Sequence, residues 1–285
     1  MARRRTAREL EAAAAARPAR PEKRAGSRFP RAEPLLMLRR RGLDPRPSAP
    51  DVPFPAEPDA ALGEALQDRL SHYAFRLFLR GAILRPAGFT PAQATRYLSA
   101  AKARAMAEDC VALGVAERLP LGRYRLLRRA RSFGGTLEWW LARELERRLG
   151  FAVAFGVRSG AAGVGGDLDV VASAEGRLLY LEAKSSPPKH VSRAEVAAFL
   201  RRVRAVRPDV ALFVVDTALR LSDKILPMFA AALAGGGRQG PPRRIFRETW
   251  ALTPHLYAVN AREDLVENVC RAIAEGLRAL SPEGP

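Results

Sequence analysis

The sequence predicts an α/β domain in which a helix, three strands, a helix and a strand follow one another over residues 136–215. Three observations predict it. An apolar stripe at helical spacing runs over Thr136–Leu149, two β-type runs lie on either side of a short turn at residues 174–177, and Val210–Val215 is wholly apolar. A wholly apolar run is typical of a central strand buried on both faces. At 285 residues and 48% hydrophobic, the chain is long enough for two folded domains.

The first segment, residues 1–58, is rich in Arg, Ala and Pro. It holds 14 Lys and Arg against 5 Asp and Glu in its first 50 residues, half of the net charge of +18. Its prolines stand at positions 18, 21, 30, 34, 45, 47, 50, 53, 55 and 58. Fixed φ angles and missing donors at these positions predict a disordered basic arm with at most a short helix near Thr6–Arg17. Such an arm either adds non-specific phosphate contacts or only solvates the chain.

Residues 59–130 read as helices followed by a hairpin. Apolar spacing predicts one long helix over residues 62–79, and Thr90-Pro91 opens a short helix that ends near Ser99. A further helix runs from about Ala100 to Leu113, where Gly114 ends it, and two short β runs follow at Val115–Leu119 and Arg123–Leu127.

This order of elements resembles that of winged helix-turn-helix domains, although no motif accompanies it. The resemblance implies a recognition helix that carries Lys102 and Arg104, and a wing that carries Arg123 and Arg125. The other interpretation is a helical accessory domain that only packs on its neighbour.

Residues 131–285 alternate helices and strands. The expected elements are a helix at Thr136–Leu149, a strand at Phe151–Val157, the two β-type runs, a helix from Ser192 to about Val206, the strand Val210–Val215, a helix over 219–234, a Gly/Pro loop over 235–243, weaker strands at Ile245–Trp250 and His255–Val259, and a helix from Arg262 to Leu280. Ser192 followed by Glu195 forms the capping box of its helix.

Three charged residues in the paired β runs point to chemistry. Asp169 lies in the first run, and Glu182 and Lys184 lie in the second. Since alternate residues of a strand share a face, Glu182 and Lys184 point the same way, with Asp169 beside them across the hairpin. Two carboxylates and an ammonium can hold Mg²⁺ or Mn²⁺ and a water next to a phosphate, because these ions favour hard oxygen donors.

The surroundings of these residues favour a site over a charged surface hairpin. Only five residues of the chain are Lys, although Arg is abundant, so Lys184 stands out. Asp169 and Glu182 interrupt apolar strands, where an unpaired carboxylate is costly to bury. Gly165-Gly166 precedes the first run and permits close approach of backbone or substrate.

The runs Gly-Asp-Leu-Asp-Val-Val and Leu-Glu-Ala-Lys resemble the motifs of the PD-(D/E)XK nuclease superfamily, in particular the branch of archaeal Holliday-junction resolvases and type IV restriction endonucleases. The resemblance covers roughly residues 133–220. It implies a restriction endonuclease-like fold and a Mg²⁺-dependent endonuclease acting on DNA. Asp169, Glu182 and the backbone carbonyl of Ala183 would be metal ligands, and Lys184 would orient or activate the water.

The superfamily also carries an inward glutamate on the helix just upstream, and Glu138 fits that position. It would reach the metal directly or through water, and the alternative is a first-turn carboxylate favoured by the helix dipole. Superfamily members frequently pair, which implies a homodimer with the helix after Arg262 as one candidate interface.

Several nearby residues have weaker assignments. Asp167 is either an outer ligand or a turn residue. Arg158, Ser159 and Lys189 are candidates for phosphate contact, and His190 favours a helix entry over a general base. His72 and His255 fit structural roles, and Asp216 fits a local ion-pair network.

Charge and cysteine content suggest the partner and the compartment. A pI near 11.2 favours a polyanionic partner, nucleic acid before membrane, although a biased genome also produces Arg-rich chains. Cys110 and Cys270 are isolated and fit reduced thiols in the cytoplasm. The alternatives to a DNA endonuclease are a regulator that binds DNA without cutting it and an adaptor that uses the sheet for protein contacts.

Overall fold

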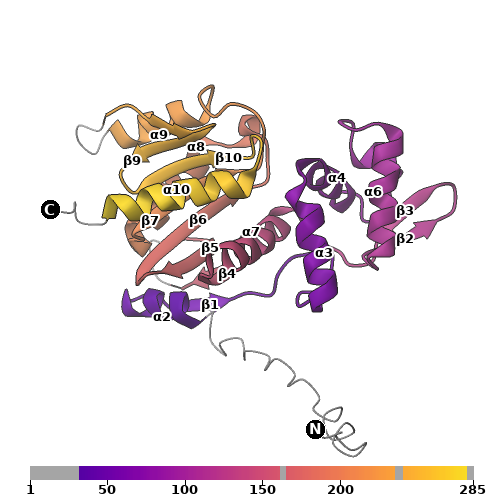
Figure 1. Ribbon diagram of the computed structural model, residues 1–285, viewed down its shortest axis with the longest axis horizontal. Helices are drawn as coiled ribbons and strands as arrows, with labels where there is room; N and C mark the ends of the chain where they lie inside the picture. The colour runs from indigo at the N-terminus through magenta and orange to yellow at the C-terminus, as the bar shows by residue number, and fades with distance from the viewer. Residues whose placement is uncertain (1–31, 161–164, 235–239, 281–285) are drawn as a thin grey trace, which may run out of the picture. The chain divides into compact units, whose positions relative to one another are not determined.

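The computed structural model describes residues 32–160, 165–234 and 240–280, which contain an eight-stranded mixed sheet with helices on both faces (Figure 1). The strand order is β1-β4-β5-β6-β7-β10-β9-β8. The strands of this sheet are β1 Pro45–Pro47, β4 Ala152–Ser159, β5 Asp167–Ala174, β6 Arg177–Lys184, β7 Val210–Val215, β8 Arg243–Phe246, β9 Thr249–Thr253 and β10 Leu256–Asn260. A separate two-stranded sheet consists of β2 Ala116–Leu119 and β3 Arg123–Leu126.

The helices that position the sheet and the hairpin are α2 Ala32–Arg40, α3 Ala60–Ser71, α4 Tyr73–Ile83, α5 Pro91–Ala94, α6 Ala100–Ala112, α7 Gly134–Leu149, the 3-10 helix η1 Pro188–His190, α8 Arg193–Val206, α9 Ile225–Leu233 and α10 Leu265–Leu280. The order α7, β4, β5, β6, α8, β7 confirms the expected helix, three strands, helix and strand. Arg31–Pro285 forms one unit by its internal contacts.

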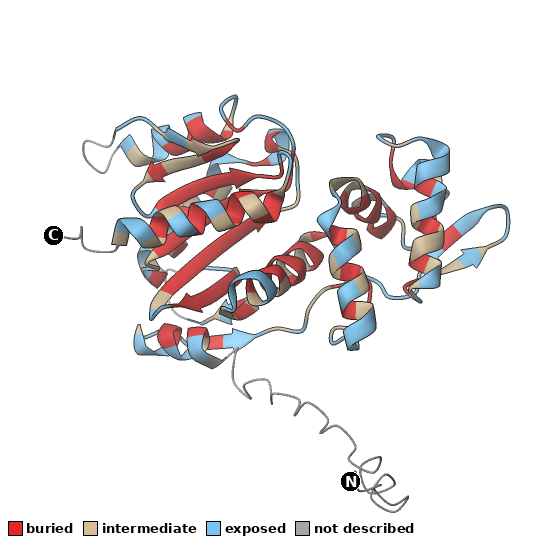
Figure 2. Ribbon diagram, viewed as in Figure 1, coloured by how far each residue is buried: buried red, intermediate tan, exposed pale blue. Residues whose placement is uncertain are grey.

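Strand direction changes across the sheet. β4, β5 and β6 form an antiparallel meander, β6, β7 and β10 run parallel, and β10, β9 and β8 are again antiparallel. Figure 2 shows the central strands as the buried part of the sheet. All six residues of β7 are buried, as its apolar sequence predicts, because helices cover both of its faces.

Two hydrophobic clusters lie on opposite faces of the sheet. On one face, α7 and α10 contribute Leu137, Leu141 and Val269 to the cluster that also receives the helices before residue 115. On the other face, α8 and α9 contribute Phe199 and Phe229, together with side chains of α2. Alternation along β6 sends Leu179, Leu181 and Ala183 to the first face and Leu178 and Tyr180 to the second.

The β5–β6 hairpin turns through two residues. Glu175 and Gly176 have φ values of 52° and 73°, the left-handed pair required by a tight turn whose twist matches the strands. Ladder pairing starts at once, with Ala174 opposite Arg177. The expected hairpin is therefore confirmed, and the turn fixes which β6 residue faces which β5 residue.

The expectation of a disordered arm is wrong for residues 32–58. Leu38 of α2 is fully buried against the sheet, and β1 pairs antiparallel with β4. Phe54 packs edge-on against Trp139 of α7 at 4.9 Å between ring centroids. Apolar burial and an edge-strand ladder outweigh the prolines, which an edge strand accommodates. Residues 1–31, with the helix expected near Thr6–Arg17, lie outside the described residues.

The expected long helix over residues 62–79 is two helices that meet at His72. His72 has an extended backbone (φ −82°, ψ 117°), so α3 ends and α4 begins at this residue. The residue is exposed to solvent. The short helix opened by Pro91 also ends earlier than expected, at Ala94, and Ser99 caps α6 instead. The β2–β3 hairpin follows α6 as expected.

The C-terminal part differs from the expected elements in two details, and its last helix packs against the sheet. The expected helix over 219–234 begins only at Ile225, and the expected strand Ile245–Trp250 is split between β8 and β9 by a turn at Arg247, which has a φ of 43°. The apolar face of α10 packs on β7, β9 and β10, so that face is not available to a second chain. Both cysteines are free thiols, and Cys110 is buried.

No helix in the described part of the chain combines the length and the apolar character needed to cross a lipid bilayer.

Candidate active site at the end of strands β5 and β6

Asp169 lies where both ladders of β5 are interrupted. The pairing of β5 with β6 extends from the turn to Val170 opposite Leu181, and it stops there without including the adjacent Asp169. On the other side, pairing with β4 passes from Phe155 opposite Val170 to Val157 opposite Leu168, and it omits the intervening position. That omitted position of β4 is Gly156, which has a φ of +57°. The strands therefore separate at the residue that the sequence singled out.

The Asp169 carboxylate bridges the opening between the two strands. Its Oδ2 accepts a hydrogen bond from the backbone N–H of Ala183 at 2.7 Å. Because the N–H and C=O of one strand residue lie on the same side, the Ala183 carbonyl also faces the β5 side. Asp169 and the Ala183 backbone are thus neighbours, as expected.

Glu182 lies at the centre of a buried polar network. Only 2% of the residue is exposed. Its Oε1 accepts from Nη2 of Arg202 at 2.6 Å and lies 2.9 Å from Nζ of Lys184, and its Oε2 accepts from the hydroxyl of Tyr180. Burial opposes ionisation of Glu182, but Lys184 and Arg202 outweigh it and hold the pKa of this carboxyl below its usual range.

Arg202 and Tyr180 also belong to the site, although the sequence patterns considered above did not predict them. Arg202 reaches from α8, donating from Nε to the Tyr180 hydroxyl at 2.9 Å and from Nη1 to the Gly165 carbonyl at 3.0 Å. Two signals were available. Arg202 interrupts the apolar face of α8 three residues after Phe199, and Tyr180 precedes Glu182 by two residues on the same strand face.

Lys184 stays an ammonium in this environment. Burial disfavours its charged form, but Glu182 outweighs burial, with further help from Asp169 and Glu195, so the pKa of Lys184 is raised. Its Nζ also lies 3.4 Å from Oε1 of Glu195 on α8. A raised pKa suits a cation that donates hydrogen bonds and stabilises negative charge, and it does not suit a base that removes a proton from water.

Glu138 lies on α7, close to Gly156, the residue that the pairing of β4 with β5 omits. A Cβ built on Gly156 would lie 3.8 Å from Oε2 of Glu138, which places this carboxylate at the β4 position opposite Asp169. Burial, together with the charges of Asp167, Glu182 and Asp51, raises the pKa of Glu138 to about 7, although Lys184 acts in the opposite direction. Glu138 is in the second turn of α7, which begins at Gly134, and not in its first turn.

Like charges also act on Asp169. Burial raises the pKa of Asp169 well above its usual range, and the carboxylates of Glu182 and Glu138 add to this. The Ala183 N–H and Lys184 act in the opposite direction. Three carboxyl groups therefore feel one another's charge, a condition that a bound cation relieves and that is frequent at functional sites.

The donor set fits a hard divalent cation only in part. Asp169 uses one oxygen for Ala183, whereas both oxygens of Glu182 already have partners. In the described residues no group of three or more His, Cys, Asp and Glu side chains is arranged to hold a metal ion. A cation at this place would take Asp169, Glu182 and the Ala183 carbonyl, and it would have to compete with Arg202 for Glu182.

The weaker candidates lie around this centre. Arg158 pairs with Asp167 at 3.6 Å, and Ser159 ends β4 opposite Pro45 of β1. Lys189 and His190 lie in η1, just beyond the end of β6, and both are exposed. Residues 161–164, in the loop that follows Ser159, lie outside the described residues.

Asp216 forms the expected ion-pair network, but with unexpected partners. Its fully buried carboxylate accepts from Nε of Arg76 at 3.0 Å and from Nη2 of Arg80 at 2.8 Å, both on α4. Its own N–H donates to the carbonyl of Lys184 at 2.8 Å. Asp216 thus joins the helices before residue 115 to the strand that carries the site.

The cations expected to contact DNA differ in how free they are. Lys102 and Arg104 are exposed on α6. Arg123 donates to the Ala87 carbonyl at 3.1 Å, and Arg125 pairs with Glu117 at 2.7 Å. The hairpin arginines are therefore partly engaged within their own unit.

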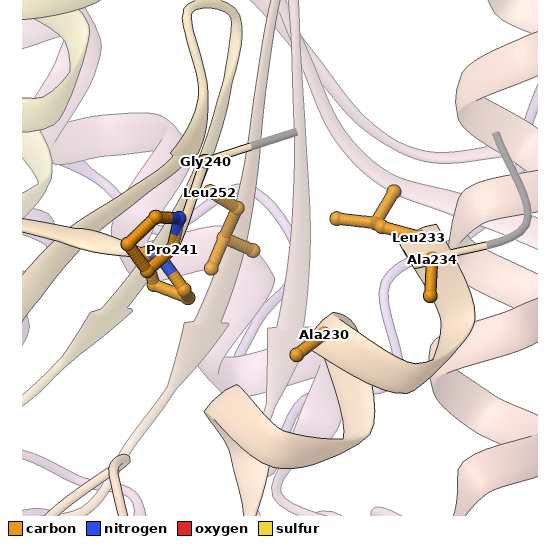
Figure 3. A pocket seen from close by; sticks show the side chains of 7 residues that line it. Ala230, Leu233, Ala234, Gly240, Pro241 and Leu252 are labelled. Atoms are coloured by element: carbon orange, nitrogen blue, oxygen red, sulfur yellow. The ribbon is translucent and has the colours of Figure 1, made fainter. Parts of the chain in front are cut away.

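A small apolar pocket of about 160 Å³ lies away from all of these residues. Its lining comes from α9, the segment that enters β8, and Leu252 of β9 (Figure 3). It carries no titratable side chain among its lining residues, so the chemistry described above does not extend to it.

Comparisons with known proteins agree with the α/β fold. No protein-family model matches the sequence, and no curated protein sequence matches it. The fold is similar to the crystal structure of protein VC1899 from Vibrio cholerae, with a TM-score of 0.52 and 13% sequence identity. The match covers 85% of this chain and 61% of VC1899, so this chain spans about three fifths of that protein's length. At this identity the likeness concerns the fold alone.

Proposed function

We propose that the protein is a metal-dependent endonuclease that hydrolyses phosphodiester bonds of DNA, with a domain of the PD-(D/E)XK type. The observation that carries the proposal is the convergence of Asp169, Glu182 and Lys184 where β5 and β6 separate. Two carboxylates and an ammonium at the end of adjacent strands would supply oxygen donors to a cation and a positive charge to a phosphate.

In this proposal Asp169, Glu182 and the carbonyl of Ala183 hold Mg²⁺ or Mn²⁺. A bound ion of this kind neutralises the phosphate charge and lowers the pKa of its water. Glu138 is near enough to share the same charge environment and would act through water. The raised pKa of Glu138 shows that negative charge is unfavourable at this place, so a bound proton or a bound cation should stabilise the folded protein.

Lys184 positions the attacking water and stabilises the charge that develops on the phosphate. Its ammonium is fixed by Glu182 at 2.9 Å and by Glu195 at 3.4 Å, so it is held in place before substrate arrives. A pre-positioned cation contributes most in a site that excludes water, because no reorganisation is needed during the reaction.

The unit of α3–α6 and the β2–β3 hairpin would be the DNA-binding accessory, arranged like a winged helix. Lys102 and Arg104 are exposed on α6, and Arg123 and Arg125 lie on the hairpin. The net charge of +18 supports an anionic partner.

One observation favours a second candidate, a DNA-binding regulator that does not cut. Arg202 and Tyr180 already bond the carboxylate of Glu182, so a metal must displace or share these partners. If Arg202 permanently takes the place of the cation, the domain binds DNA through its basic surface and leaves the phosphodiester intact.

Cleavage assays separate the two. Purified protein is incubated with plasmid, branched and single-stranded DNA, with Mg²⁺, Mn²⁺ or EDTA. A nuclease cuts at least one DNA with a divalent ion and loses about 10²-fold or more of that activity in Lys184→Ala and Asp169→Asn. Asp223→Asn, an exposed carboxylate outside the site, is the matched control. Binding of DNA without cleavage under every metal would establish the regulator instead.

A further inference from the structure

A cleft of about 910 Å³ opens beside the end of β6, outside the site described above. The described residues that line it come from α4, α5, the segment after α5, the segment after β6 and the segment after β7. Those that matter below are Arg80, Arg85, Arg96, Tyr97, Pro187 and Lys189. The volume falls within the range of about 300–1,000 Å³ typical of small-ligand sites.

The lining is cationic and partly apolar. Arg80, Arg85, Arg96 and Lys189 contribute positive charge, and none of the described lining residues is Asp or Glu. Asp216, next to the lining residue Thr217, is fully buried, and its carboxylate accepts hydrogen bonds from Arg76 and Arg80. An anion is therefore the ligand whose charge complements the cleft.

An exposed aromatic ring stands among these cations. Tyr97 is 64% exposed, which is unusual for a large ring, and the guanidinium of Arg96 lies 5.2 Å from its centroid. Nη2 of Arg96 also donates to the Tyr97 hydroxyl at 3.2 Å. Arg96, and more weakly Lys189 and Arg80, lower the pKa of this tyrosine, and the same three cations line the cleft with it.

The cleft and the candidate active site share one edge of the sheet. Pro187 in the cleft wall is three residues beyond Lys184, and the Lys184 carbonyl accepts from the N–H of Asp216 at 2.8 Å. The carboxylate of Asp216 in turn fixes Arg80, a lining residue, at 2.8 Å. The cleft wall and the Lys184 backbone are therefore neighbours at the end of β6.

We propose that the cleft binds an unpaired nucleotide of the DNA substrate, with its base against Tyr97 and its phosphates at Arg96 and Lys189. This inference rests on the proposed nuclease function and names its substrate as DNA with an unpaired or extruded segment. An aromatic ring offers a stacking platform to any base, and cations beside it hold the backbone. A base inside an intact duplex cannot stack on a protein ring, so paired DNA does not fill this cleft.

Binding measured in EDTA tests the cleft without cleavage. Fluorescence anisotropy compares a labelled single-stranded DNA with the blunt duplex of the same sequence. Tyr97→Ala is expected to weaken binding of the single strand about 5- to 150-fold, the range of one base–aromatic stack, and to change duplex binding less than about twofold. Tyr97→Phe retains the ring and is expected to bind like the native protein. Arg96→Ala and Lys189→Ala are expected to weaken single-strand binding and to reduce its dependence on salt.

Controls make the outcome decisive. Arg204→Ala removes an exposed arginine outside the cleft and is expected to leave the preference for single strands unchanged. Because Tyr97 is exposed, thermal melting of Tyr97→Ala should match the native protein. Crosslinking of a single strand that contains 5-iodouracil should map to Tyr97.

Three results would overturn the inference. They are an unchanged affinity of Tyr97→Ala for single strands, an equal loss on single strand and duplex, and binding of dAMP as tight as that of the oligonucleotide, which would mark a free-nucleotide pocket. A different result would reject the nuclease function without rejecting the cleft. If no DNA is cut with any metal while Tyr97 still governs single-strand binding, the cleft assignment stands alone.

Discussion

The guanidinium of Arg202 on α8 lies 2.6 Å from Oε1 of Glu182 on β6, and both residues are buried. The same oxygen lies 2.9 Å from Nζ of Lys184. A helix side chain thus fixes the carboxylate that the strand presents, and the position of Lys184 follows from that of Glu182. This contact therefore contributes both to the stability of the protein and to the geometry of its candidate site.

Arg202→Met should destabilise the protein by about 3–5 kcal/mol, because it leaves the buried Glu182 carboxylate with one cation fewer. Urea denaturation measures the loss, and Arg201→Met, the exposed neighbour on α8, is the matched control. Glu182→Gln combined with Arg202→Met should cost less than the sum of the two single changes.

If Glu182 is a metal ligand, Arg202→Met should also change how the protein responds to Mg²⁺. Mg²⁺ should raise the melting temperature of this variant more than that of the native protein, because the ion no longer competes with the guanidinium. A stability loss no larger than that of Arg201→Met would contradict the central role of Arg202.

Stability should fall as the pH rises through neutrality, in part because of Glu138. Burial, with the charges of Asp167 and Glu182, raises its pKa from 4.5 to about 7. An acid with a raised pKa binds more protons when folded, so its stabilising effect is complete below about pH 4.5 and is lost as the pH rises through about 7. Glu138→Gln should therefore be more stable than the native protein at pH 8, by an amount on the order of 1–3 kcal/mol.

Denaturation curves between pH 5 and pH 8 check this sign. Glu146→Gln, which removes a carboxylate of the same helix that pairs with Arg143, is the control. Parallel pH profiles for the native protein and Glu138→Gln would show that Glu138 does not titrate in this range.

Asp216→Asn should detach α4 from the end of β7. The fully buried carboxylate holds Arg76 and Arg80, so its neutralisation leaves two arginines without their anion and should cost about 3–5 kcal/mol. Native-state hydrogen exchange should show the largest loss of protection in α4. Asp223→Asn removes an exposed carboxylate only a few residues away, and an equal effect of the two changes would refute the prediction.

Gly156→Ala should cost more than Gly150→Ala. Both glycines have a left-handed backbone, with φ of +57° and +66°, which costs an alanine about 1–2 kcal/mol. A Cβ at Gly150 meets no atom within 4 Å, whereas one at Gly156 would lie 3.1 Å from Oγ of Ser48. Thermal melting compares the two variants, and equal losses would show that the packing at Gly156 adapts freely.

The candidate site was predictable where its geometry is local. Glu182 and Lys184 share a face because strand periodicity is two, and a two-residue turn places Asp169 across from them. The capping box at Ser192 and the buried strand Val210–Val215 follow from equally local rules. The αβββαβ order could therefore be predicted from the sequence.

Residues that act through tertiary contacts could not be predicted in this way. Arg202 meets Glu182 only because α8 packs across β6 in one register, which no local pattern determines. The same reason applies to Asp216, whose partners Arg76 and Arg80 come from 136 or more positions earlier. The ordered segment at residues 32–58 was missed because proline content describes propensity, whereas burial of Leu38 and Phe54 decides the outcome.

The short strand Pro45–Pro47 closes one side of the main sheet. It pairs with Ala152–Ser159, and its two prolines have no N–H to offer a further strand. A protein shortened to begin at residue 59 would leave the outer backbone groups of Ala152–Ser159 open to strand addition by another chain. Loss of the proline-rich strand should therefore favour self-association of the shortened protein through this edge.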